Sequence, residues 1–155
     1  MATGISPLIH ERRLKVGGRS IQIVLILFGA LTAGCGHKSK SVSDLCSDLR
    51  ALSSWTEQVD LFIGYIEDEK ATNDYALGHV RYIDSEVKEA FKDLEEATAE
   101  PQLDPLLREC RQHYSFLIEQ VGRLQLNLKN PSVLDDIKNE IQRIHAASER
   151  TRAIL

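Results

Sequence analysis

Residues 45–66 read LCSDLRALSSWTEQVDLFIGYI, and the apolar pattern of these residues indicates the fold class. Its apolar residues recur at alternating spacings of three and four, at Leu45, Leu49, Leu52, Trp55, Val59, Phe62 and Ile66. Such spacing places them along one side of a helix with 3.6 residues per turn, where they form a stripe that must be buried. The stretch therefore predicts a helix that packs against other helices, and not a strand.

Three further segments carry the same pattern. Their apolar positions begin at Ala76, at Leu103 and at Leu134 and continue at helical spacing to Ala97, Leu128 and Ile144. The predicted fold class is all-α, a small up-and-down bundle of about four helices joined by short loops. We expect the helices over residues 42–69, 73–98, 105–129 and 133–152.

Polar residues and prolines between the segments predict where two helices begin. Asp104 precedes Pro105, which suits an N-cap followed by proline at the first helical position. Ser132 and Asp135 have the spacing of a capping box at the start of the last helix. Both signals lie in short connections, and short connections favour consecutive helices that pack antiparallel to each other.

The charge of the chain is unevenly distributed. Residues 57–104 hold fourteen acidic and four basic side chains, a balance of −10, whereas residues 105–155 hold eight basic and six acidic side chains, a balance of +2. An acidic domain repels phosphate backbones, so we expect no binding to nucleic acid.

The first 34 residues differ from the rest of the chain. After a basic beginning comes IQIVLILFGALTA at 21–33, an apolar run of thirteen residues. This length is typical of the apolar region of an export signal, and it is short for a membrane span, which needs about 20 residues. The run ends in Leu31-Thr32-Ala33-Gly34-Cys35.

That ending resembles the lipobox of bacterial lipoproteins, in which a leucine, two small or hydroxylic residues and a glycine or alanine precede a cysteine. The resemblance implies that Cys35 is lipidated and that residues 1–34 are removed as a signal peptide. Two or three acyl chains would then hold the protein stably at a membrane. The alternative is an uncleaved anchor that ends in a chance cysteine.

The same resemblance implies a domain organisation and a location. Residues 1–34 form the signal peptide, residues 35–41 the lipidated cysteine with a short polar tether, and residues 42–155 the helical bundle. The location is the cell envelope. Because Gly36 and not aspartate follows the cysteine, the outer membrane is favoured over the inner membrane in a diderm organism.

Cys46 and Cys110 form an even pair, which suits a disulfide in an oxidising compartment. In an up-and-down order the first and third helices run parallel, so both thiols lie at the same end of the bundle. A bridge would require the first three helices to pack as a triangle, with the fourth on one flank. The alternatives are two buried thiols or a metal or redox site with His113, for which no fourth ligand is identifiable.

The turn between the first two predicted helices combines tyrosines with carboxylates. Tyr65, Tyr75 and Tyr82 lie off the apolar stripes near it. Four carboxylates crowd into the same turn with only Lys70 to offset them: Glu67, Asp68, Glu69 and Asp74. If the domain receives a basic partner, we expect these carboxylates to do so, with Tyr65 and Tyr75 as apolar anchors. The plainer interpretation is a solvated acidic surface.

No motif of a known catalytic site occurs, whether a phosphate-binding loop, HExxH, CxxC or GxSxG. We therefore expect no enzymatic activity, no cofactor and no metal. Our hypothesis is an envelope lipoprotein that binds or pilots another envelope protein, similar in plan to the pilotins of secretion systems. The alternative is a ligand-binding or sensory bundle with an apolar internal pocket. A filled core with an exposed groove would favour the protein partner. The oligomeric state is left open.

Overall fold

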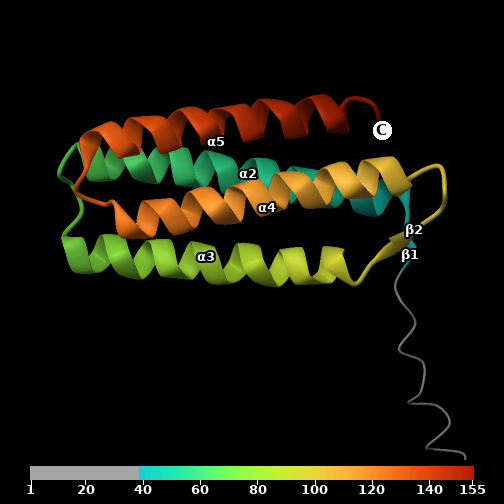
Figure 1. The fold of residues 1–155 in the computed structure, drawn as a ribbon, viewed down its shortest axis with the longest axis horizontal. Helices are drawn as coiled ribbons and strands as arrows, with labels where there is room; N and C mark the ends of the chain where they lie inside the picture. The colour runs from blue at the N-terminus through green and yellow to red at the C-terminus, as the bar shows by residue number, and fades with distance from the viewer. Residues whose placement is uncertain (1–38) are drawn as a thin grey trace, which may run out of the picture. The chain divides into compact units, whose positions relative to one another are not determined.

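The computed structural model describes residues 39–155, which form a four-helix bundle with one very short strand pair (Figure 1). The predicted all-α class is confirmed. The elements follow one another as β1 (Ser39–Lys40), α2 (Val42–Glu67), α3 (Asn73–Glu95), β2 (Thr98–Ala99), α4 (Asp104–Leu126) and α5 (Pro131–Arg152). Cys35 and the expected signal peptide lie outside the described residues.

The helices alternate in direction, so α2 and α4 run one way and α3 and α5 the other (Figure 1). The most extensive packing is that of α5 on α2, followed by α3 on α4 and α4 on α5, whereas α2 and α3 touch little. The central triangle is therefore α2, α4 and α5, and α3 covers a flank of α4. This corrects the triangle of the first three helices that a disulfide would have required.

The core of the bundle is filled. Its apolar side chains are at most 7% exposed, and every helix contributes a continuous stripe. Leu49, Val80, Leu117 and Ile141 represent the four stripes, and each is no more than 1% exposed. None of these four helices is long and apolar enough to cross a bilayer.

The short strands attach the start of the described chain to the bundle. β1 and β2 are parallel, with Ser39 opposite Thr98 and Lys40 opposite Ala99. The ammonium group of Lys40 lies 2.8 Å from the carboxylate of Asp48 on α2. Ser39 and Lys40 therefore belong to the fold, and not to a free tether as expected from their polarity.

Two helix starts differ from the sequence-based prediction. α4 begins at Asp104 itself, after Leu103 at the N-cap, so Pro105 is not the first helical residue. α5 begins at Pro131 after Asn130, which places Ser132 inside the helix. The expected capping box does not form, because the Ser132 hydroxyl donates to the side chain of Asn130 instead, at 3.0 Å.

The end of α2 differs as well, because the helix stops at Glu67 and not at residue 69. The N–H of Glu69 donates to the carbonyl of Ile66 at 3.0 Å, and that of Lys70 donates to the carbonyl of Tyr65 at 3.1 Å. This is the Schellman arrangement, in which one residue adopts the left-handed conformation that glycine tolerates best. Here that residue is Glu69, with φ of 55°.

We expect Glu69→Gly to raise the free energy of unfolding by about 0.5–1 kcal/mol, because glycine adopts a positive φ without a clash at Cβ. Urea denaturation of the two proteins measures the difference. Asp68→Gly is the matched control, because Asp68 has φ of −75° and gains nothing from glycine. Equal effects of both substitutions would contradict a strained Glu69.

Candidate functional site

An aromatic groove lies between α2 and α3. We use this name for the hollow of about 570 Å³ lined by Ser54, Glu57, Gln58, Leu61, Phe62 and Tyr65 of α2 and by Tyr75 and His79 of α3. It follows the half of the bundle that ends at the α2–α3 turn, where the two helices pack loosely. The groove is open to solvent along one side, so it suits an extended or helical segment better than an enclosed small molecule.

Ring contacts connect the two walls of this groove. The ring centroids of Phe62 and His79 lie 4.3 Å apart. Tyr75 stacks on His79 at 5.9 Å, and Tyr82 continues the row at 6.3 Å from His79. Tyr75, His79 and Tyr82 follow one another at spacings of four and three, which puts them on one side of α3. Neither His79 nor Phe62 was predicted from the sequence as part of the site. The stripe of Tyr75, His79 and Tyr82 beside the core stripe is a sequence signal that could have indicated His79.

Apolar surface is concentrated around the aromatic groove. The described residues include eight large apolar side chains that are exposed, and four of them, Leu61, Tyr65, Tyr75 and Tyr82, lie in or beside it. Leu61 is 75% exposed and Tyr75 57%. A gathering of exposed aromatic rings on one face is typical of a protein-binding surface, whereas single exposed apolar residues are ordinary.

The structure separates the tyrosines from the carboxylates that were predicted with them. Tyr65 and Tyr75 line the aromatic groove, but Glu67 points away from it and pairs with Lys138 of α5 at 3.1 Å. Asp68 pairs with Lys70 at 2.7 Å, and this contact lowers the pKa of the Asp68 carboxyl and raises the pKa of Lys70.

Of the other two predicted carboxylates, Asp74 is exposed in the first turn of α3 and Glu69 faces a second hollow. The only carboxylate that lines the aromatic groove itself is Glu57. The six residues predicted as one partner-binding set therefore lie on different faces.

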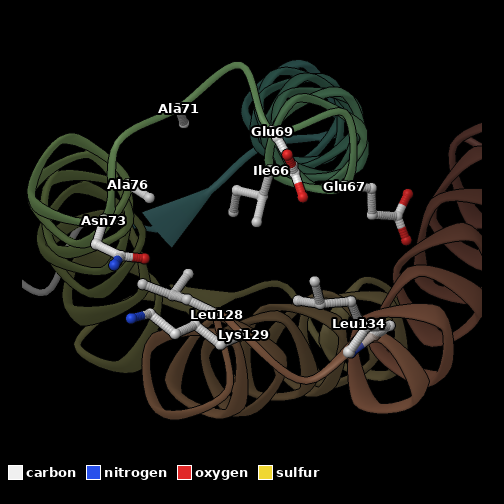
Figure 2. Close-up of a pocket in the computed structure, with 10 residues that line it drawn as sticks. Ile66, Glu67, Glu69, Ala71, Asn73, Ala76, Leu128, Lys129 and Leu134 are labelled. Atoms are coloured by element: carbon white, nitrogen blue, oxygen red, sulfur yellow. The ribbon is translucent and has the colours of Figure 1, made fainter.

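The second hollow, which we call the distal pocket, lies at the end of the bundle formed by the α2–α3 and α4–α5 connections (Figure 2). Its volume is about 370 Å³. Apolar side chains form about half of its wall, namely Ile66, Ala71, Ala76, Leu128, Pro131 and Leu134. Polar side chains from three segments surround its mouth: Glu67, Glu69, Asn73 and Lys129.

Cys46 and Cys110 are both free thiols, so the expected disulfide is not formed. Cys110 is 1% exposed and packs in the core as a small apolar residue. Cys46 follows the buried Leu45, so it is rotated by about 100° around α2 and lies at the border of the stripe. Burial, and secondarily the nearby Asp48 carboxylate, raises the pKa of the Cys110 thiol to about 12. This thiol is therefore protonated and a poor nucleophile.

Polar side chains are also buried where α5 meets its neighbours. The hydroxyl oxygens of Ser53 and Ser148 lie 3.2 Å apart, and His113 Nε2 lies 3.4 Å from the hydroxyl of Thr151. Thr151 in turn donates to Glu109 at 2.9 Å. Burial lowers the pKa of His113, so its ring is neutral and satisfied by a hydroxyl. Residues 39–155 contain no group of three or more His, Cys, Asp or Glu side chains arranged to hold a metal ion.

Comparison with protein-family models, with curated proteins and with solved structures finds no match.

The difference between the two thiols predicts their reactivity. With a maleimide reagent at neutral pH, we expect Cys46 to react in the folded protein and Cys110 to react only after denaturation, because the Cys110 thiol is buried and protonated. Peptide mass spectrometry of the full chain assigns each adduct. A peptide pair joined through both cysteines, with neither one labelled, would restore the disulfide.

Proposed function

We propose that this protein is a lipid-anchored, non-enzymatic protein of the bacterial cell envelope that binds another envelope protein through its aromatic groove. The observation that carries the proposal is the combination of a filled core with exposed aromatic rings on one face. Side chains that are packed to a few per cent exposure leave little internal space for a ligand. The groove, by contrast, leaves Leu61, Tyr65 and Tyr75 exposed to solvent, so that their free faces can contact a partner.

The chemistry of the groove favours a partner segment that is both apolar and basic. Aromatic faces attract lysine and arginine side chains, and Glu57 supplies a carboxylate in the groove. The segment from residue 57 to residue 104, which includes most of both walls, carries a balance of −10. Long-range attraction of this kind acts mainly on the association rate and weakens as salt is added.

The lipid anchor is supported by the residues that precede the bundle. The order of basic beginning, apolar run and Leu31–Cys35 is that of lipoprotein signals, and the first described residues enter the bundle at β1. From there α2 rises over 26 residues, about 39 Å, to the α2–α3 turn. The aromatic groove therefore follows the half of the bundle that is farther from β1.

The alternative function, a ligand-binding or sensory bundle with an apolar internal pocket, has less support in that form. The stripes that would line an internal pocket are packed against one another. The distal pocket is hollowed into one end of the bundle and does not continue between the helices as an apolar channel would.

We expect Cys35→Ser to block maturation, because the thiol is the acyl acceptor and serine does not replace it. The variant should accumulate as the longer precursor, and only the unaltered protein should incorporate labelled fatty acid. Cys46→Ser is the matched control and should mature normally. Normal processing of the Cys35 variant would remove the lipoprotein assignment.

The aromatic groove is tested by site-specific photo-crosslinking in cells that produce the protein natively. A benzophenone amino acid at Leu61 should give a discrete adduct with one envelope protein, whereas the same group at Leu126, which is 84% exposed and outside the groove, should give none.

With the partner identified, Tyr65→Ala should weaken binding about 30-fold, the loss typical of an aromatic anchor. Phe116→Ala is the matched control, because Phe116 is 44% exposed against 42% for Tyr65 but lies on α4. Equal crosslinking at both leucines, or equal losses in both alanine variants, would count against the groove.

A further inference from the structure

The distal pocket has the size and lining of a small-molecule site. Its volume of about 370 Å³ is near the lower end of the range of ligand pockets, about 300–1,000 Å³. Ile66 and Leu128 point into it from opposite sides (Figure 2), and Leu134 adds a third branched side chain. This lining suits a compact ligand with both an apolar and a charged part, because it offers methyl groups for contact beside the polar side chains of the mouth.

The charges at the mouth leave one anion and one cation without a partner. Glu67 is already bound by Lys138 at 3.1 Å. Within residues 39–155, neither Glu69 nor Lys129 has an opposite charge within 4.0 Å. Figure 2 shows Glu69 at the end of α2 and Lys129 on the opposite side of the pocket.

The helix ends reinforce this separation of charge. Glu69 follows the C-terminus of α2, where the backbone carbonyls make the helix end negative. Asn73 is the first residue of α3 and lines the pocket together with Lys129, so the positive end of this 23-residue helix borders the pocket as well. One side of the mouth therefore attracts a cation and the opposite side attracts an anion.

The conformation of Glu69 fits the same arrangement. Its φ of 55° is a strained value for a residue with a side chain, and glycine would avoid the strain. With glutamate at this position, an exposed carboxylate lines the mouth of the distal pocket. Strained residues are commonly found where a side chain must be held for a ligand.

We propose that the distal pocket binds a small zwitterion with an apolar body, such as a free α-amino acid with a branched aliphatic or aromatic side chain. The ammonium group lies at Glu69, the carboxylate lies between Lys129 and the start of α3, and the side chain contacts Ile66, Leu128 and Leu134. This site shares no lining residue with the aromatic groove, so the proposed ligand can be tested independently of the proposed protein partner.

The test is isothermal titration calorimetry of the full-length protein in detergent, with L-leucine and L-phenylalanine as probes. Two analogues of leucine each keep one charge: L-leucinamide has only the ammonium group and 4-methylpentanoate only the carboxylate. We expect at least one amino acid to bind, and its single-charge analogues to bind about tenfold more weakly or worse.

Charge variants identify which group meets which side chain. Glu69→Gln should weaken leucine and leucinamide and leave 4-methylpentanoate unchanged, whereas Lys129→Gln should weaken leucine and 4-methylpentanoate and leave leucinamide unchanged. Asp68→Asn is the matched control: it removes the neighbouring carboxylate, which does not line the pocket, and should change nothing. Ala71→Phe should fill the pocket and abolish binding, with the fold checked by circular dichroism.

Several results would overturn the proposal. One is the absence of binding of both amino acids at about 10 mM, a concentration that reveals even weak millimolar sites. A second is equal affinity for leucine and leucinamide, which would remove the role of Lys129. A third is undiminished binding to a correctly folded Ala71→Phe variant, which would place the ligand elsewhere.

Discussion

The packing of α5 between α2 and α4 is the interaction on which the rest of the bundle depends. The stripe of Leu134, Ile137 and Ile141 is buried against both helices, and α2 makes its most extensive contact with α5. Because α2 and α3 touch little, α3 is held mainly through α4. This explains the aromatic groove. Because α2 packs mainly on α5 and α3 packs mainly on α4, the two helices do not pack closely on each other, and aromatic side chains line the space between them.

Periodicity alone predicted the four helices, because each apolar stripe is a local property of the sequence. It did not predict which helices are neighbours, since stripes of similar width fit several arrangements. Ser39 and Lys40 pair with residues almost sixty positions away, and no local pattern indicates a partner at that separation. The helix starts were misplaced by one or two residues. Asp104 and Ser132 are residue types that favour the N-cap, yet Leu103 and Asn130 occupy the N-cap positions.

The candidate site was predicted in part. Tyr65 and Tyr75 were found because they lie off the stripes, yet they were grouped with carboxylates that are close only in sequence. Each residue of a helix is rotated by about 100° from the one before it, so Glu67 faces Lys138 of α5 while Tyr65 faces α3. Cys110 was expected to form a bridge because of its chemistry, but its position on an inward stripe decided its role as a core residue.

The pairing of β1 with β2 has a mechanical consequence. A pull on the chain ahead of Ser39 meets the hydrogen bonds to Thr98 and Ala99 and the contact between Lys40 and Asp48 before it reaches the first turn of α2. The force therefore acts on α2 and on the connection from α3 to α4 together. The pairing of β1 with β2 and the contact between Lys40 and Asp48 must break before α2 can unwind from its first residue. A protein attached to a moving surface through this end would keep its helices in place under loads that would fray a helix tethered directly.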